Sequence, residues 1–131
     1  MNDFYYRNVD AYKSSKELTK LTYNLLFKFP EYERYALCDQ IRRAAISVPS
    51  NIAEGLGRFA IKERIHFLDI AYGSLTEVVC QMEIAHDNQY ISDSDFAQVD
   101  TLATRVSMTI YGLKKSLNEK IKIQEHINNQ E

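Results

Sequence analysis

A sustained heptad repeat constrains the fold of this chain more than any other sequence feature. Between residues 61 and 89, apolar side chains recur at alternating steps of four and three, the spacing that keeps them on one side of an α-helix. A second apolar row runs beside the first, and two adjacent rows suit a helix that contacts more than one neighbour. The first row is Ile61, Ile65, Leu68, Tyr72, Leu75, Val79 and Met82, and the second is Phe67, Ala71, Ser74, Val78 and Ala85.

The rest of the chain predicts three more helices. Only two prolines and four glycines interrupt the 131 residues, which favours long helices over a turn-rich β fold. Short loops between long helices make consecutive helices antiparallel neighbours. The sequence therefore predicts an all-α fold, an antiparallel up-down-up-down four-helix bundle that forms a single domain over residues 1–131. The predicted helices cover about 9–29, 33–56, 61–89 and 94–120. Before the last of them, Ser92 followed three residues later by Asp95 resembles a capping box with Asp in place of Glu.

The second predicted helix contains a proline. Pro49 lies within the apolar pattern formed by Ile41, Val48 and Ile52. Proline has no N–H to donate to the carbonyl of Ala45, and its ring crowds that carbonyl. We therefore expect a kink at this point of the helix.

Small residues predict a close contact between the second and third helices. Ala44 and Ala45 on one helix and Ala71 and Gly73 on the other would let the two backbones approach. A glycine inside a helix costs about 1 kcal/mol relative to alanine. Gly73 is therefore expected to have a packing reason.

Charge is distributed unevenly along the chain. The net charge of −2 excludes a general affinity of the whole chain for polyanions. Residues 34–64 nevertheless carry six basic and three acidic side chains, whereas residues 65–100 carry seven acidic side chains and neither Lys nor Arg. The folded chain should have a basic end and an acidic end. The six basic residues are Arg34, Arg42, Arg43, Arg58, Lys62 and Arg64.

The two cysteines indicate a reducing compartment. Cys38 and Cys80 lack metal-ligand spacing, and no secretory signal precedes them. The apolar runs are too short to cross a bilayer. We expect a cytoplasmic protein without a membrane partner, with both thiols reduced and buried as small hydrophobic side chains at one level of the bundle.

Four-helix bundles can hold di-iron sites built from Glu-x-x-His motifs. This chain has two, Glu63-x-x-His66 and Glu83-x-x-His86, but both fall on the same predicted helix. A di-iron site needs such motifs on two different helices at one level. The sequence therefore predicts no metal site and no cofactor.

Glu54 and Glu77 could serve as paired carboxylates in a hydrolase. The favoured interpretation is a network of ion pairs, with Glu54 bound to Arg58 and Glu77 bound to Arg42 or Arg43. No histidine, nucleophile or phosphate-binding glycine loop accompanies the carboxylates. We therefore expect that the chain is not an enzyme, and the hydrolase remains a weak third alternative.

The basic residues offer a more specific hypothesis. Guanidinium groups match phosphate oxygens in geometry, so Arg42, Arg43, Arg58, Lys62 and Arg64 are candidates for binding nucleic acid. The alternative is a solvated helix face whose arginines form internal ion pairs.

Two blocks of the sequence resemble a known bacterial family. The run from Gln40 to Gly55, followed by Gly57 and Arg58, resembles the signature of the four-helix bundle protein family, also called the 23S ribosomal RNA intervening sequence protein family. Residues 67–77 are similar to its second block. Members are encoded within intervening sequences of large-subunit ribosomal RNA genes, hence a ribosomal-protein label. The resemblance implies a helical bundle of unknown function with no established enzymatic activity.

A relative of that family, the accessory protein of diversity-generating retroelements, forms a pentameric barrel that binds nucleic acid and reverse transcriptase. The resemblance therefore implies a homo-oligomer of five subunits, with Arg42, Arg43 and Arg58 as nucleic-acid contacts. It also implies a set of structural signature residues. These are Pro49, Ser50, Asn51, Glu54, Gly55, Gly73 and Glu77.

The leading hypothesis is a non-enzymatic, homo-oligomeric bundle that binds RNA or another nucleic acid through the basic face of its second helix. The alternative is a protein–protein interaction scaffold without a nucleic-acid ligand. In that alternative, the acidic residues 65–100 of one subunit would pair with the basic end of a neighbour.

Overall fold

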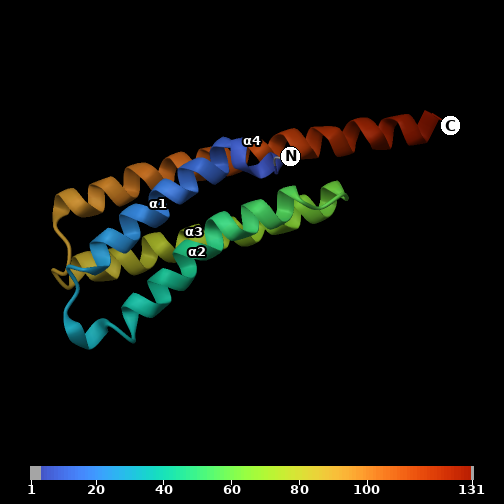
Figure 1. Ribbon diagram of the computed structural model, residues 1–131. Helices are drawn as coiled ribbons and strands as arrows, with labels where there is room; N and C mark the ends of the chain where they lie inside the picture. Colours follow the sequence, from blue (N-terminus) through green and yellow to red (C-terminus); the bar gives the residue numbers. More distant parts are fainter. Residues whose placement is uncertain (1–3, 131) are drawn as a thin grey trace.

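The computed structural model describes residues 4–130, and within that range the chain is helical without any strand. Consecutive long helices run in opposite directions (Figure 1), which confirms the all-α four-helix bundle. Residues 1–3 and 131, which the domain prediction included, lie outside the described residues. The elements are η1 (Tyr5–Asn8), α1 (Asp10–Leu26), η2 (Glu31–Glu33), α2 (Leu37–Leu56), α3 (Ile61–Asp87) and α4 (Asp93–Gln130).

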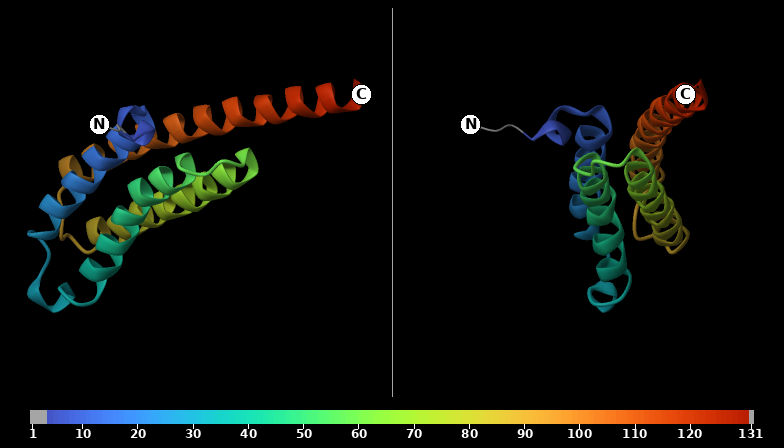
Figure 2. Two further views of the ribbon diagram at one scale, coloured as in Figure 1. Left: turned by 45° about the vertical axis from the view of Figure 1, so that its right-hand side comes forward. Right: turned by 90° about the vertical axis from the view of Figure 1, so that its right-hand side faces the viewer.

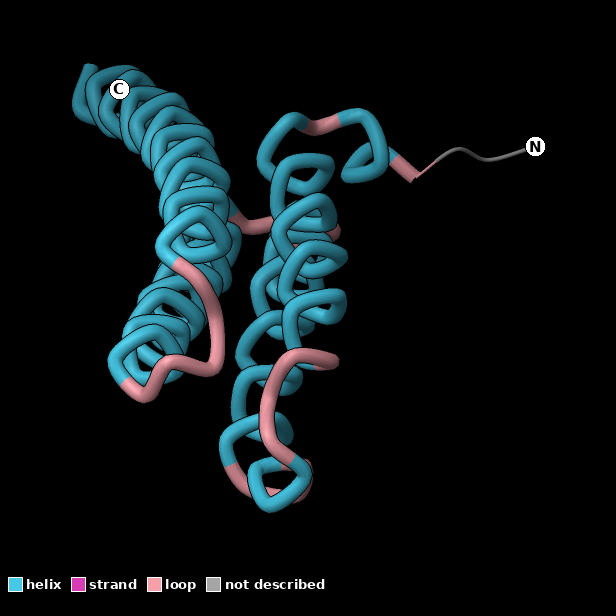
Figure 3. Tube along the Cα trace, turned by 90° about the vertical axis from the view of Figure 1, so that its left-hand side faces the viewer, coloured by secondary structure: helices cyan, strands magenta, loops and turns pink. Residues whose placement is uncertain are grey.

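The four helices enclose one core. α1 packs against α2 and α4, and α3 packs against the same two helices, with the most extensive contact between α2 and α3. Seen along the bundle, the helices occupy four corners (Figure 2). The connections between them are confined to the two ends of the bundle (Figure 3), so the long faces of the helices are the surfaces available to a partner.

The core is made of the apolar rows that the helical spacing predicts. Leu18, Ile52, Leu68 and Val106, one from each long helix, are all buried. The predicted row on α3 has one error, because Tyr72 is 49% exposed. Tyr72 lies at the edge of that row, beside α4 rather than between the helices.

Several predicted helix ends were wrong. α1 ends at Leu26, and Phe29 is buried after the chain has left the helix. α2 begins at Leu37 rather than near residue 33, because the residues after Pro30 form the separate short helix η2. α3 ends at Asp87. α4 continues to Gln130 instead of ending near residue 120, because the sequence after residue 117 contains neither glycine nor proline.

Pro49 leaves one carbonyl of α2 without its helical partner, and α1 supplies a replacement. Proline cannot donate to the carbonyl of Ala45, four residues earlier. The Thr19 hydroxyl lies 3.1 Å from that oxygen and 3.0 Å from the carbonyl oxygen of Ser15 in its own helix. Because Ala45 is buried, leaving its carbonyl unpaired would be costly. The bend expected at Pro49 remains a prediction.

Gly55 permits the close approach of α2 and α3. A Cβ atom at this position would lie 2.8 Å from the Cβ of Phe67 and 3.1 Å from the carbonyl oxygen of Arg64. Gly73 is different, since a Cβ atom there would meet nothing within 4 Å. The prediction that Gly73 has a packing reason was wrong, because it lies on the exposed side of α3 while Ala71 takes the buried position.

Gly55→Ala should destabilise the bundle by about 1–3 kcal/mol, because the added methyl group forces α2 and α3 apart. Gly73→Ala is the matched control and should raise stability by up to about 1 kcal/mol, since alanine favours the helix. Urea unfolding followed by circular dichroism measures both. Equal effects of the two changes would contradict the close contact at Gly55.

Thr19→Val should cost about 1 kcal/mol of stability in the natural chain, because the Ala45 carbonyl loses its partner. In a Pro49→Ala background the cost should be smaller, since the N–H of the new alanine can donate to that carbonyl. A double-mutant cycle by urea unfolding measures the difference.

Thr101→Val is the control for this cycle, because the Thr101 hydroxyl bonds only the carbonyl of Ala97 in its own helix. Its cost should be independent of residue 49. If Thr19→Val costs the same in both backgrounds, Thr19 does not replace the missing helical bond.

Candidate nucleic-acid interface

The two arginines in the first half of α2 differ in their surroundings. Arg42 is half-buried, forms an ion pair with Asp39 and donates a hydrogen bond to the carbonyl oxygen of Arg34 at 3.2 Å. Arg43 is exposed and has no ion pair with any residue in the range 4–130. Arg43 is therefore the α2 arginine that is open to an anionic ligand.

The other predicted basic residues gather at the turn between α2 and α3. Arg58 pairs with Glu54, as predicted, and its guanidinium lies 4.9 Å from the centre of the Phe67 ring. Arg64 Nε donates to the carbonyl oxygen of Arg58 at 2.6 Å. Lys62 is exposed. Arg58 and Arg64 thus stabilise the turn, so both have a structural role.

The five predicted residues do not form one patch. Arg42 and Arg58 are sixteen positions apart: Arg42 lies in the first half of α2, and Arg58 follows the end of this helix at Leu56. At 1.5 Å per residue the two arginines are about 24 Å apart along the axis. Helical periodicity predicts which side of a helix a residue occupies, but residues at opposite ends of that helix remain far apart.

Sequence reasoning missed a second set of cations on α1. Lys13, Lys16 and Lys20 are exposed, and none pairs with a carboxylate of the described chain. The Lys16 ammonium lies 5.3 Å from the centre of the Tyr12 ring. Their spacing of three and four residues places all three on one side of the helix, and this spacing was the signal available in the sequence.

The α1 lysines and the α2 arginines lie on two neighbouring helices that pack against each other. The contact between Thr19 and Ala45 sets these residues at one level. Because α1 and α2 are antiparallel neighbours, Lys20 and Arg43 are also at about the same level. We call this surface the α1–α2 basic face. It comprises Lys13, Lys16, Lys20, Arg42 and Arg43.

The two candidate carboxylates are not brought together. A hydrogen bond of 2.8 Å between the hydroxyls of Ser47 and Ser74 sets the register of α2 and α3. Glu54 lies seven residues beyond Ser47 and Glu77 three residues beyond Ser74, in opposite directions. Their separation is therefore about 15 Å along the axis, which removes support from a paired-carboxylate site.

The predicted ion pair between Glu77 and an arginine of α2 is also missing from the described residues. Glu77 is exposed, whereas its neighbour Val78 takes the buried position. Of the other signature residues, Asn51 donates from its side chain to the Ser47 carbonyl at 2.8 Å, and Ser50 is exposed.

A model of the 23S rRNA-intervening sequence protein family matches residues 7–112 of this chain. The chain belongs to that family. The matched segment contains the four-helix core and all of the α1–α2 basic face. No curated protein matches the chain.

A solved structure shows the same family fold. It is a protein of unknown function from the S23 ribosomal protein family of Bacteroides thetaiotaomicron, 20% identical in sequence, with a TM-score of 0.73. The alignment covers 80% of this chain and 98% of that chain. At this identity the likeness concerns the fold alone.

The described residues offer neither a cluster of metal ligands nor a membrane-spanning helix. Residues 4–130 contain no group of three or more His, Cys, Asp or Glu side chains that could hold a metal ion. Among the helices in that range, none combines the length and apolarity required to span a bilayer.

Both cysteines are free thiols, but only one occupies the predicted environment. Cys38 is buried, and desolvation raises the pKa of its thiol. Cys80 is exposed, so the prediction that it is a buried hydrophobic residue was wrong. It lies on the side of α3 that faces α4 rather than α2, in a hollow that it lines together with Asp100 and Ala103 of α4.

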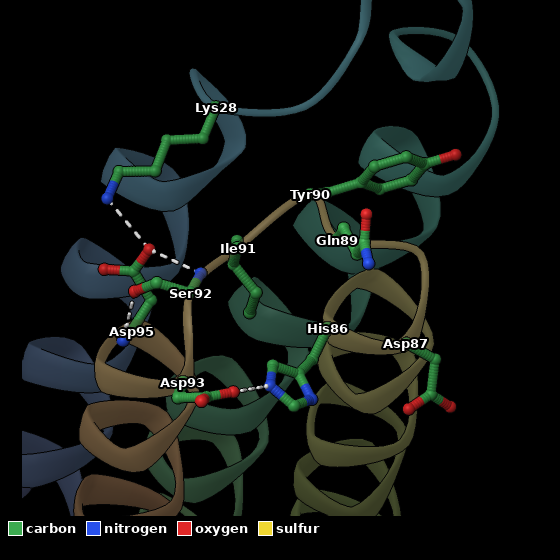
Figure 4. A pocket seen from close by; sticks show the side chains of 9 residues that line it. All are labelled: Lys28, His86, Asp87, Gln89, Tyr90, Ile91, Ser92, Asp93 and Asp95. Atoms are coloured by element: carbon green, nitrogen blue, oxygen red, sulfur yellow. Dashed lines mark hydrogen bonds and ion pairs between the residues drawn. The ribbon is translucent and has the colours of Figure 1, made fainter.

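A pocket at the α3–α4 loop is lined by polar groups that bind one another (Figure 4). Lys28 Nζ lies 2.8 Å from Asp95 Oδ2. The backbone N–H of Ser92 donates to Asp95 Oδ2 at 3.1 Å, and that of Asp95 donates to Ser92 Oγ at 3.0 Å. This confirms the predicted capping box. His86 pairs with Asp93 at 2.6 Å, so the loop joins α3, α4 and the end of α1.

Asp95 should make the stability of this family member depend on pH. The hydrogen bond from Lys28, followed by the bonds with Ser92, lowers the pKa of the Asp95 carboxyl. A carboxyl whose pKa is lowered by folding stabilises the folded state in full at pH values above its unfolded pKa of about 4. This stabilisation is lost as the pH falls through the folded pKa. Asp95→Asn should therefore cost at least about 1 kcal/mol at pH 7 and flatten the decline in stability below about pH 4.

Urea unfolding at a series of pH values measures this effect. Asp100→Asn is the control, because Asp100 is exposed on the same helix and has no ion pair with a described residue. An Asp95→Asn protein that keeps the full acid-dependent loss of stability would show that another group is responsible.

Proposed function

We propose that this member of the 23S rRNA-intervening sequence protein family is a non-enzymatic, self-associating bundle that binds RNA or another nucleic acid through its α1–α2 basic face. The proposal includes a cytoplasmic location and a homo-oligomer, for which the family resemblance suggests five subunits. Arg58, Lys62 and Arg64 are secondary contacts at the α2–α3 turn.

The observation that carries the proposal is the shortage of carboxylate partners on this face. Lys13, Lys16, Lys20 and Arg43 have no ion pair with the described residues. The pair between Arg42 and Asp39 lies near the surface, with about a third of each side chain exposed. Such a pair contributes about 0–1 kcal/mol, so a phosphate group can replace the Asp39 carboxylate at little cost.

Aromatic side chains beside the lysines favour a nucleic acid with accessible bases. Tyr23 is 38% exposed and follows Lys16 by seven residues, or about two turns of α1. Bases stack on such rings while lysines neutralise the backbone. The acidic residues 65–100 belong to other elements, and the net charge of −2 does not prevent local binding.

A protein–protein scaffold is the second candidate. Apolar side chains are exposed on the side of the bundle formed by α3 and α4, including Tyr72, Met108 and Tyr111. An apolar surface of this kind indicates contact with protein rather than with phosphate. The two functions use different faces and can be tested separately.

Binding of a labelled structured RNA should weaken steeply as salt rises, because phosphate contacts release counterions. Arg42→Ala combined with Arg43→Ala should weaken binding and reduce the slope of log K against log salt by about two. Lys13→Ala, Lys16→Ala and Lys20→Ala together should reduce it by about three. Fluorescence anisotropy at several salt concentrations measures both.

Lys115→Ala is the matched control, since Lys115 is exposed on α4 rather than on α1 or α2. This change should leave the slope nearly unchanged. A natural protein that binds no RNA at low salt, or equal slopes for all variants, would refute binding through the α1–α2 basic face.

A further inference from the structure

An apolar groove runs between α3 and α4. Two adjoining hollows of about 410 and 440 Å³ form it, and they share Tyr72, Ser107 and Met108. Met108 is 69% exposed, Tyr111 68% and Tyr72 49%. From Asp100 to Tyr111 the groove is about 17 Å long at 1.5 Å per residue. We call it the α3–α4 groove. Its main apolar lining is Tyr72, Val79, Cys80, Ala103, Met108 and Tyr111.

The end of α4 projects beyond the bundle (Figure 1). Residues 118–130, which we call the α4 extension, form the end of this helix, and its last turns have no other helix beside them. They lie outside the family segment 7–112, and the B. thetaiotaomicron protein is covered almost completely by 80% of this chain. The extension therefore lies beyond the segment that the family model matches.

The α4 extension carries apolar side chains that are exposed to solvent. Ile123 is 61% exposed and Ile127 47% exposed. A helical segment of about 13 residues is only marginally stable in water. Exposing an apolar stripe to water adds to the free-energy cost of this segment. Packing this stripe against another surface would stabilise both the segment and the apolar side chains.

The α4 extension and the α3–α4 groove match in length and in charge. The extension is about 20 Å long, close to the length of the groove. Lys120, Ile123 and Ile127 are spaced by three and four residues, so they project from one side. At one end the groove is bordered by the carboxylates of Glu83 and Asp100, which suit the ammonium of Lys120. At the other end lies Lys114, whose charge is already paired with Asp69.

We infer that the α4 extension of one copy packs into the α3–α4 groove of a second copy. The extension cannot reach its own groove, because both belong to one continuous α4 helix. Each copy offers one extension and one groove, so the contact closes either as a ring or as a reciprocal exchange between two copies. The inference specifies the self-association included in the proposed function and does not depend on nucleic-acid binding.

Two full-length double variants test the inference by sedimentation equilibrium in the absence of nucleic acid. Ile123→Glu with Ile127→Glu alters the extension, and Met108→Glu with Tyr111→Glu alters the groove. All four side chains are exposed, so the fold should persist by circular dichroism. Each variant alone should associate at least about tenfold more weakly than the natural protein, because a buried unpaired charge opposes the contact.

Mixing the two variants provides the decisive measurement. The groove of the extension variant and the extension of the groove variant are both intact, so the mixture should form a complex of two copies that neither variant forms alone. Phe59→Glu is the control, since Phe59 is 98% exposed in the α2–α3 turn, and its mass in solution should equal that of the natural protein.

Three outcomes would overturn the inference. The natural protein could remain monomeric at high concentration, which would also refute self-association in the proposed function. Alternatively, it could associate while either double variant associates equally well, which would place the interface elsewhere. A mixture that stays monomeric would show that the groove and the extension do not contact each other. None of these results bears on RNA binding, which the salt series measures separately.

Discussion

The close contact between α2 and α3 is the constraint on which the rest of the bundle depends. Gly55 has no side chain, so the backbone of α2 can approach Phe67. The hydroxyl bond between Ser47 and Ser74 fixes the register of the two helices, and the Arg64 side chain closes the turn by binding the Arg58 carbonyl. This hairpin provides the most extensive helix contact in the fold and determines which surfaces of α1 and α4 face the solvent.

Two polar interactions then attach the outer helices to this hairpin. The Thr19 hydroxyl meets the carbonyl that Pro49 leaves open, so a local defect in α2 becomes a specific contact with α1. At the other end, Asp95 caps α4 and binds Lys28 after α1. Because buried polar groups are costly when unpaired, each interaction favours one arrangement of the helices. The arrangement leaves a basic face on α1 and α2 and an apolar groove between α3 and α4.

In the proposed function, these two faces serve as separate surfaces for two kinds of partner. Unpaired cations on α1 and α2 suit phosphate groups, whereas exposed aromatic and methionine side chains beside α4 suit protein. Arg58 and Arg64 resemble Arg43 in the sequence but are engaged in holding a turn. A side chain with an internal partner contributes less to a ligand than one without, and this difference distinguishes the cations of the α1–α2 basic face from those at the turn.

The fold class, the four helices and most of their buried positions could be predicted from the sequence alone, because helical periodicity and the scarcity of Gly and Pro are local properties. The same holds for the capping box at Ser92 and Asp95, whose two residues lie within one turn. Tertiary structure decided the rest: Gly55 rather than Gly73 makes the close contact, Thr19 replaces a bond missing at Pro49, and Lys20 lies level with Arg43. Such pairings depend on the register between helices, which is set by contacts between residues distant in the chain.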